Sequence, residues 1–232
     1  HAANCAAGFN REPAPFEIVA IDHAAFNDDD ALVEALTDAQ AVLHFAGVNR
    51  APDDEVEAVN PAIATRLASA CQKVGVAPHL VYANSTHSVS DTPYGRSKRR
   101  AGEILAEQSG RYTDLVLPHI FGEGARPFYN NVTATLVAQI LAGEAPSINP
   151  EGRVQLLHAG AAAQAAIDAV LAGVTGRIEP APHPISVSDL NGALKGFHDG
   201  YLANIYPDIS DPLNRDLFNS YRAATYPDGW PR

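Results

Sequence analysis

The residues best suited to proton transfer are a serine, a tyrosine and a lysine in one short stretch of the chain. Ser85 follows an apolar segment, His79–Asn84, that is typical of a β-strand, and Tyr94 begins a helical pattern that includes Lys98. Tyr94 and Lys98 are one helical turn apart and therefore share a helix face. A tyrosine phenol titrates near pH ~10, and a neighbouring ammonium favours the phenolate and lowers that pKa. The spacing therefore predicts a proton-transfer site with Ser85 as its third member.

Elements of alternating type surround these residues. Helical patterns cover 29–36, a segment from Asn60 or Pro61 to about Lys73, and a segment from Tyr94. Short apolar runs lie between them and are expected to be strands: 16–22, 41–46, 79–84 and 114–118. Strands that alternate with helices indicate a doubly wound parallel α/β sheet of the Rossmann type.

The pattern changes after about residue 126. The chain then carries four further helical patterns: 132–141, 159–171, 187–201 and 213–226. We expect residues 1–126, with 150–175 returning to them, to form an NAD(P)-binding Rossmann domain. Residues 127–149 and 176–232 would form a small, mostly helical substrate-binding lobe. The last residues, Tyr226–Arg232, have the composition of a linker.

Composition limits the classes of partner. The chain has 232 residues and a net charge of −11, which argues against nucleic acid or an anionic membrane as a partner of the whole surface. No apolar run is long enough to cross a bilayer. Its two cysteines form no motif and favour a reducing compartment, by default the cytoplasm. The nine histidines show no ligand spacing, so we expect no metal. Methionine is absent altogether, so we expect either a fragment of a longer product or residues missing from the printed sequence.

Four segments resemble, in order, the extended short-chain dehydrogenase/reductases, which are NAD(P)-dependent nucleotide-sugar epimerases, dehydratases and reductases. The segments are His44–Gly47, Asn60 with Thr65, the set Ser85, Tyr94 and Lys98, and Pro118–Gly122. The resemblance implies that Tyr94 gives a proton to a carbonyl oxygen as hydride arrives from the nicotinamide. Ser85 would hold that oxygen, and Lys98 would lower the Tyr94 pKa and bind the nicotinamide ribose.

The same resemblance implies a set of cofactor contacts, for NAD or NADP without a preference. The implied contacts are Phe45, Ala46, Gly47, Asn60, Tyr94, Lys98, Pro118 and Ile120. Asp22 lies where an acidic residue can bond a ribose 2′-hydroxyl, or it can simply cap a helix. His44 is expected to be a core histidine rather than a participant.

A nucleotide-sugar substrate would meet a second set of residues. Ser85 and Thr86 are the strand-end hydroxyls, and Arg153 and Arg126 could neutralise a diphosphate. Asn130 and Asn131 could bond the sugar nucleotide or cap a helix. Arg50 is either a phosphate contact or a solvated charge. The helices from Asn60 and from Tyr94 carry small residues that could pair two subunits into a homodimer.

A narrower resemblance concerns His44–Arg50 and Pro127–Thr135, which look like the capsular-polysaccharide branch of the family. Those enzymes join such a domain to a C-terminal cupin and reduce a 4-keto-6-deoxy UDP-sugar. One departure is that only Gly8 precedes Gly47, so the family's first strand and glycine-rich phosphate turn are not found. We expect that segment to be missing from the printed sequence. The alternative is a non-catalytic Rossmann protein that senses a ligand or redox state.

Overall fold

A parallel sheet organises the first part of the chain in the computed structural model, which describes residues 2–226. Its strands lie in the order β1-β2-β3-β6, and all neighbours are parallel. The strands are β1 (Ala41–His44), β2 (His79–Ser85), β3 (Tyr112–Leu117) and β6 (Gly176–Ile178). Because all of them point the same way, their carboxyl ends meet at one edge, which is where ligands bind in such sheets.

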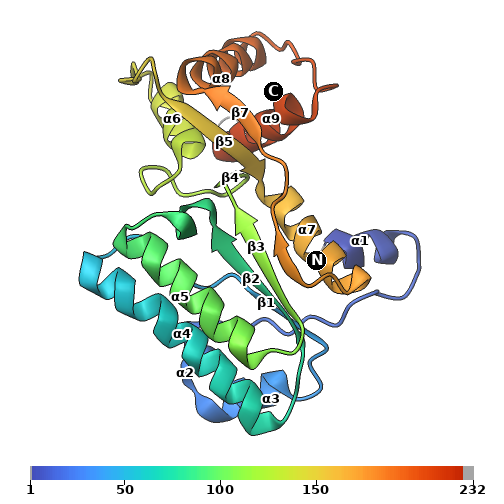
Figure 1. Ribbon diagram of the computed structural model, residues 1–232. Helices are drawn as coiled ribbons and strands as arrows, with labels where there is room; N and C mark the ends of the chain where they lie inside the picture. Colours follow the sequence, from blue (N-terminus) through green and yellow to red (C-terminus); the bar gives the residue numbers. More distant parts are fainter. Residues whose placement is uncertain (1, 227–232) are drawn as a thin grey trace.

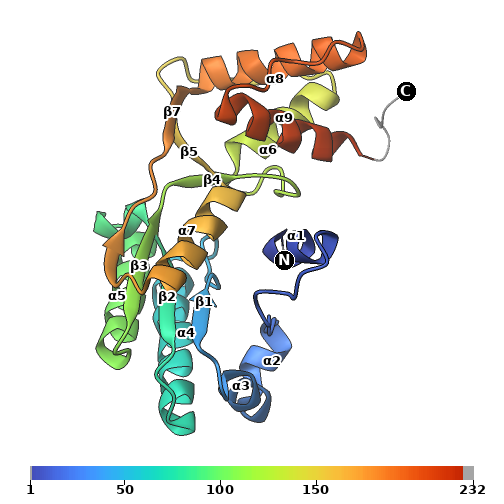
Figure 2. The same cartoon turned by 90° about the vertical axis from the view of Figure 1, so that its right-hand side faces the viewer.

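Helices cover both faces of this sheet, as Figure 1 and Figure 2 show. One face carries α3 (Asp29–Leu36), α4 (Asp53–Val74) and α5 (Pro93–Gln108), and α7 (Ala159–Ala172) covers the other. The side chains of the central strand β2 point alternately to these two faces. Leu80 and Tyr82 pack with α3, α4 and α5, whereas Val81 packs with α7. The α/β doubly wound prediction is therefore confirmed.

The chain leaves the main sheet at Pro118, which cannot donate to a strand ladder. Directly after it, β4 (His119–Phe121) belongs to a second sheet with β5 (Arg153–His158) and β7 (His183–Ser186). The β4–β5 pair is parallel and the β5–β7 pair antiparallel. Three helices pack around this sheet: α6 (Val132–Leu141), α8 (Val187–Leu202) and α9 (Pro212–Thr225).

The second part differs from the expected lobe in two details. It contains a three-stranded sheet as well as helices, and β6, from the range 176–232, extends the main sheet beside β3. The core of this part is rich in aromatic rings, since Phe197, Phe218 and Tyr221 are all buried. Most of the expected linker, 227–232, lies outside the described residues.

Two of the expected elements are wrong. Residues 16–22 form no strand, although the segment is rich in β-favouring residues, because no neighbouring strand pairs with it in the described chain. The helix expected to start at Asn60 or Pro61 instead starts at Asp53 and contains Pro61. Three acidic residues in its first turn favour the earlier start, since they complement the helix dipole. The remaining short elements are α1 (Ala2–Phe9), α2 (His23–Asn27) and the 3₁₀ turn η1 (Thr86–Val89).

β1 forms an open edge of the main sheet. It pairs with β2 on one side, and no described strand pairs with its other side. Leu43 in β1 and Phe45 directly after it are exposed, as are Ile18, Val19 and Ile21 of the segment 16–22. Gly8 lies in α1, with nothing within 4 Å of the position a Cβ would take, so it forms no phosphate turn here.

None of the described helices is both long and apolar enough to span a membrane. The helices α4 and α5 pack side by side along much of their length. Their expected pairing between two subunits stays a prediction.

Candidate active site

The fold brings Ser85 and Tyr94 together at the carboxyl edge of the main sheet. Ser85 is the last residue of β2, and Tyr94 lies in the first turn of α5. The Ser85 hydroxyl lies close enough to the Tyr94 phenol to lower the pKa of Tyr94, although burial raises that pKa by more. Ser85 also accepts a hydrogen bond from the His87 N–H at 3.2 Å, which fixes its side chain at the start of η1.

Lys98 lies one turn further along α5 and is 6% exposed. Its Nζ donates to the Ala83 carbonyl at 2.6 Å and lies 4.1 Å from the centroid of the Tyr82 ring. Burial lowers the pKa of Lys98 to about 8. The expected lowering of the Tyr94 pKa by Lys98 is wrong for this arrangement, because burial dominates at Tyr94 and the ammonium is held toward the Ala83 carbonyl.

Gly95 allows η1 to pack against the start of α5. A Cβ at Gly95 would lie 2.4 Å from the His87 carbonyl oxygen and 2.5 Å from that of Ser90. Real Cβ atoms do not approach backbone oxygens so closely, so only glycine fits here without a shift. The glycine directly after Tyr94 therefore lets the loop that follows Ser85 approach the tyrosine.

Asn60 is buried and clamps the loop after β1 to α5. Its Oδ1 accepts from the Val48 N–H at 2.7 Å, and its Nδ2 donates to the Val48 carbonyl at 2.8 Å and to Ser97 Oγ at 2.9 Å. Ser97 Oγ donates in turn to the Tyr94 carbonyl at 2.8 Å. Both amide N–H groups of Asn60 are thereby used. Asn60 therefore positions the loop beside the tyrosine, and its expected contact with a cofactor stays a prediction.

No motif in the sequence predicts the polar network that lies below Ser85. Asn84 accepts from the Ser85 N–H at 2.8 Å and donates to Asp114 at 2.8 Å, and Tyr112 also donates to Asp114. The alternation of β2 places Asn84 on the same face as Tyr82, which is the one signal that could have indicated it. His44 is the expected core histidine: it is buried, stacks on Tyr82, and burial lowers its pKa to about 4.

The nicotinamide-ribose end of a cofactor fits the described residues. Lys98 is a buried cation that spends one N–H on the Ala83 carbonyl, which leaves donor capacity for a ribose hydroxyl. A Cβ at Gly47 would lie 2.9 Å from Asn60 Oδ1 and 4.0 Å from Lys98 Nζ, so the Gly47 backbone comes close to the lysine. Phe45 and Ala46 are exposed on the same loop, while Pro118 and Ile120 are half-buried at the β3–β4 junction. Their contacts with a cofactor stay predictions.

Asp22 acts here as a helix cap. Its carboxylate accepts from the Ala25 N–H at 2.8 Å at the start of α2. This is the capping role that the sequence left open, and a bond to a ribose stays a prediction. No glycine-rich turn for a pyrophosphate occurs among residues 2–226.

A hollow of about 580 Å³ lies at the start of α6. Its polar side chains are one histidine and a set of amides and hydroxyls: His119, Asn130, Asn131, Thr135, Gln139, Ser147 and Asn149. Burial lowers the pKa of His119, so this ring is neutral at neutral pH, and its Nε2 is buried without a partner among the described residues. The hollow suits a neutral ligand part that is rich in hydrogen-bonding groups.

The two asparagines in this hollow differ. Asn131 caps α6 by accepting from the Ala134 N–H at 2.9 Å, and its amide donates to the Ile120 carbonyl at 3.1 Å. Asn130 adopts a positive φ of 51° and has no such structural role. Thr86 is exposed in η1 and Arg153 is exposed at the start of β5. Neither lines the hollow, and their substrate contacts stay predictions.

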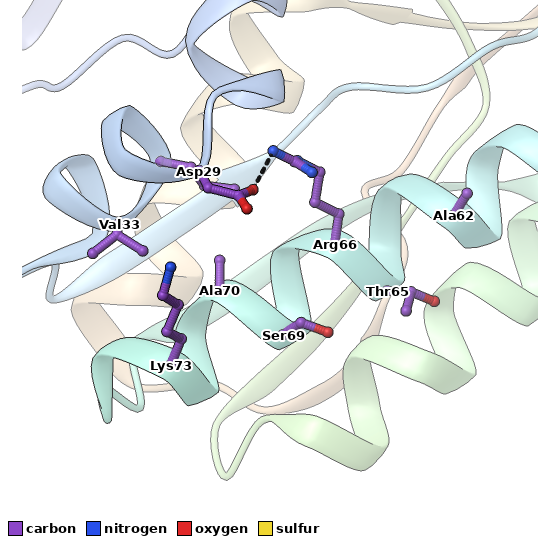
Figure 3. Close-up of a pocket in the computed structure, with 9 residues that line it drawn as sticks. Asp29, Val33, Ala62, Thr65, Arg66, Ser69, Ala70 and Lys73 are labelled. Carbon is purple, nitrogen blue, oxygen red and sulfur yellow. Dashed lines mark hydrogen bonds and ion pairs between the residues drawn. The ribbon is translucent and has the colours of Figure 1, made fainter.

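A second hollow, of about 500 Å³, lies between α3 and α4 (Figure 3). Arg66 enters it from α4 and forms an ion pair with Asp29 at 2.6 Å, while Thr65 and Lys73 lie along the same helix. The triad of Ser85, Tyr94 and Lys98 does not line this hollow. This hollow is therefore separate from the candidate active site.

Comparison with known proteins agrees with this geometry. A curated relative, the UDP-2-acetamido-2,6-beta-L-arabino-hexul-4-ose reductase of Pseudomonas aeruginosa strain PA103, is 28% identical over 200 residues. The match covers 82% of this chain and 54% of the relative, so the chain spans about half the length of that protein. In sequence, the chain is therefore similar to a nucleotide-sugar reductase. No protein-family model matches the chain.

Solved structures show the same fold. The capsular polysaccharide assembling protein CapF of Staphylococcus aureus superposes with a TM-score of 0.69 at 23% identity, over 86% of this chain and 57% of CapF. A UDP-N-acetylglucosamine 4-epimerase of Methanobrevibacter ruminantium M1, in complex with UDP-N-acetylmuramic acid, gives 0.72 at 18% identity. That match covers 88% of this chain and 82% of the epimerase. These likenesses establish a Rossmann-like α/β fold.

Proposed function

We propose that the chain is the catalytic domain of an NAD(P)-dependent oxidoreductase or epimerase that acts on a nucleotide sugar. The observation that carries the proposal is that Ser85 approaches Tyr94, with Lys98 buried one turn away, at the carboxyl edge of a parallel sheet. The curated relative is named as a reductase of a UDP-linked 4-keto sugar, and the structural neighbours include epimerases and dehydratases. All of these names fit chemistry at a sugar carbonyl or hydroxyl.

Tyr94 is the proton donor in the reducing direction. Burial raises the pKa of Tyr94, which keeps the phenol protonated and able to donate to a carbonyl oxygen that gains negative charge. The Ser85 hydroxyl, which lies beside the phenol, can donate to the same oxygen and hold it in place. A nicotinamide, when bound, supplies or accepts the hydride.

Lys98 holds the cofactor end of the site. Its pKa of about 8 leaves it charged at neutral pH, and its free donor capacity can bind a ribose hydroxyl. The hydrogen bonds of Asn60 hold the Gly47–Val48 loop at a fixed distance from α5. This orients Lys98 and Tyr94, which both lie on α5.

The substrate we favour is a UDP-linked 4-keto-6-deoxy sugar of surface-polysaccharide synthesis, reduced at its carbonyl. The name of the curated relative and the likeness to CapF support this choice. The hollow beside α6 supports it as well, because its amide and hydroxyl side chains match the neutral polar groups of a sugar and a base.

The test is Tyr94→Phe in the full chain with NADPH, NADH and a 4-keto UDP-sugar. We expect turnover, followed by loss of the NAD(P)H absorbance, to fall at least ~1000-fold, since general acid catalysis contributes up to ~10⁴-fold. Cofactor affinity should stay within about twofold of the unmodified chain. Unchanged turnover would refute the assignment. Cofactor binding without turnover by the unmodified chain would favour a ligand sensor instead.

A further inference from the structure

Asp114 faces the same interface as Lys98. It lies in β3 beside Tyr82 of β2, its cross-strand partner. Tyr112, two residues earlier in β3, packs in one core cluster with Tyr82, so the alternation of the strand turns Asp114 toward α5 as well. Lys98 reaches this interface from α5, and its Nζ lies 4.1 Å from the centroid of the Tyr82 ring. Asp114 and Lys98 therefore both lie beside one aromatic ring.

The Asp114 carboxylate is tied to Ser85 through one asparagine. Asn84 Nδ2 donates to Asp114 Oδ1 at 2.8 Å, and Asn84 Oδ1 accepts from the Ser85 N–H at 2.8 Å. Tyr112 Oη donates to the same oxygen of Asp114 at 3.3 Å. A carboxylate can only accept, so it selects the nitrogen of the Asn84 amide and leaves the amide oxygen for Ser85. Asp114 therefore fixes which way the Asn84 amide points.

The helix α5 leaves space for this cluster. It runs along β2 and β3 (Figure 1), and Gly102 lies one turn after Lys98 on the same helix face. A Cβ at Gly102 would lie 3.0 Å from Tyr112 Oη and 3.5 Å from Asn84 Nδ2. The helix face that carries Lys98 therefore packs directly on the two groups that bond Asp114.

Asp114 is the negative charge among the titratable groups of this interface. The other titratable side chains around it and Lys98 come from β1, β2, β3, β6 and α5: His44, Tyr82, Tyr94, Tyr112 and Arg177. Burial lowers the pKa of His44 to about 4 and raises the pKa of each tyrosine, so these rings are uncharged at neutral pH. Arg177 lies 3.8 Å from Asp114 but is 46% exposed, so solvent screens its charge.

Two effects on Lys98 oppose each other. Burial lowers the pKa of Lys98 to about 8, because the ammonium loses hydration, and the Asp114 carboxylate acts to raise that pKa. A pKa of about 8 leaves the ammonium charged at pH 7 by a narrow margin. Any further fall would remove the charge from part of the molecules at neutral pH.

We propose that Asp114 is a positioning residue of the candidate active site. Through Asn84 it orients the backbone at Ser85, and across the interface with α5 it is the largely buried counter-charge that keeps Lys98 an ammonium. This inference rests on the proposed function, because Asp114 acts on the reaction only through Ser85 and Lys98.

The main variant that tests this role is Asp114→Asn. Asparagine keeps an oxygen that can accept from Asn84 and Tyr112, so the hydrogen bonds of the fold remain while the charge is lost. The matched control is Asp168→Asn on α7, on the opposite face of the sheet. Asp168 is exposed and accepts from Gln164 at 2.8 Å, which asparagine can also do.

The direct readout is an NMR pH titration of the full chain, labelled with ¹³C at the lysine Cε. The chain has the lysines Lys73, Lys98 and Lys195, and Lys98→Met identifies the signal of Lys98. The Cε shift follows the charge of the amine next to it. It therefore reports the charge of Lys98 without a cofactor, a substrate or turnover.

We expect the titration midpoint of Lys98 to fall by about one pH unit in Asp114→Asn, since a nearby opposite charge shifts a pKa by about 1–3. In Asp168→Asn it should move by less than about 0.3, because solvent screens an exposed charge on the other face. Asp114→Glu keeps the charge and should hold the midpoint within about 0.5 of that of the unmodified chain. A Lys98 midpoint that is the same in Asp114→Asn and Asp168→Asn would overturn the proposal.

Turnover of NADPH with a 4-keto UDP-sugar gives a second readout. The alkaline loss of kcat/KM, which reports groups of the free enzyme, should begin at lower pH in Asp114→Asn than in Asp168→Asn. A purely structural role of Asp114 would instead lower the rate at every pH and leave the shape of the profile unchanged.

The two proposals fail in different ways. If the Lys98 midpoint moves but no nucleotide sugar is turned over, the role of Asp114 at Lys98 stands and the proposed function falls. If a nucleotide sugar is turned over while the Lys98 midpoint ignores Asp114, the function stands and the proposal for Asp114 falls.

Discussion

Replacing Gly95 with alanine tests whether the close approach of η1 to α5 aligns Ser85 with Tyr94. The new Cβ would lie 2.4 Å from the His87 carbonyl oxygen and 2.5 Å from both the carbonyl oxygen and Oγ of Ser90. Two of these three atoms are backbone, so η1 must move away from α5. Forced insertion of a methyl group into a packed site costs about 1–3 kcal/mol, and alanine regains about 1 kcal/mol of helix propensity.

The expected net loss is therefore about 0–2 kcal/mol of the free energy of unfolding. For a chain of this size, each kcal/mol shifts Tm by about 2–4 °C. Activity should fall much further, on the order of 100-fold, because the moved segment follows Ser85 directly and a displacement of ~1 Å can cost that much. Thermal unfolding by circular dichroism and turnover of NADPH with a 4-keto UDP-sugar measure the two effects.

Gly192→Ala is the matched control. Gly192 also lies within a helix, α8, but nothing lies within 4 Å of its Cβ position. The same substitution there should raise Tm slightly, since only the helix propensity of about 1 kcal/mol changes. If both alanine variants keep full activity and equal Tm, the packing argument for Gly95 is refuted.

Two further predictions concern the buried polar groups. Asn60→Ala leaves both backbone groups of Val48 and the Ser97 hydroxyl without their partner, so the free energy of unfolding in urea should fall by about 3 kcal/mol; an unchanged midpoint would contradict this. Lys98 has a pKa of about 8 when folded against an ordinary 10.5, so the folded state binds fewer protons between these values and stability should rise with pH across that window. Lys98→Met should remove up to about 3 kcal/mol of this rise in the free energy of unfolding, measured by urea unfolding at pH 7 to 10.5. If the free energy of unfolding changes with pH in the same way in the unmodified chain and in the variant, the prediction is refuted.

Local sequence patterns predicted the elements that depend on local forces. The helices at 29–36 and 132–141 have the expected bounds, and the strand before Ser85 and the helix after it are where the spacing placed them. The segment 16–22 shows the limit of this reasoning. Its composition suits a strand, but a strand needs a neighbour, and its neighbours are set by contacts distant in sequence.

The same limit applies at the site. The triad could be predicted because its three members are close in sequence, and His44 could be assigned to the core from its strand. The Asn60–Ser97 bond and the Arg50–Phe128 bond join residues 37 and 78 positions apart, which no local pattern indicates. The orientation of the Lys98 side chain could not be predicted either, because it depends on contacts with the Ala83 carbonyl and the Tyr82 ring across the helix–sheet interface.

The open edge of β1 has a practical consequence for work with this chain. Unpaired backbone N–H and C=O groups along an edge strand are a template for pairing with another chain. Leu43 in β1, 43% exposed, and Phe45 directly after it, 50% exposed, add apolar surface to that edge. Concentrated samples should therefore self-associate through β1, and amide hydrogens in β1 should exchange with solvent faster than those in the central strand β2. A lysine in place of Leu43, which is exposed on β1, should keep the protein dispersed without touching the site.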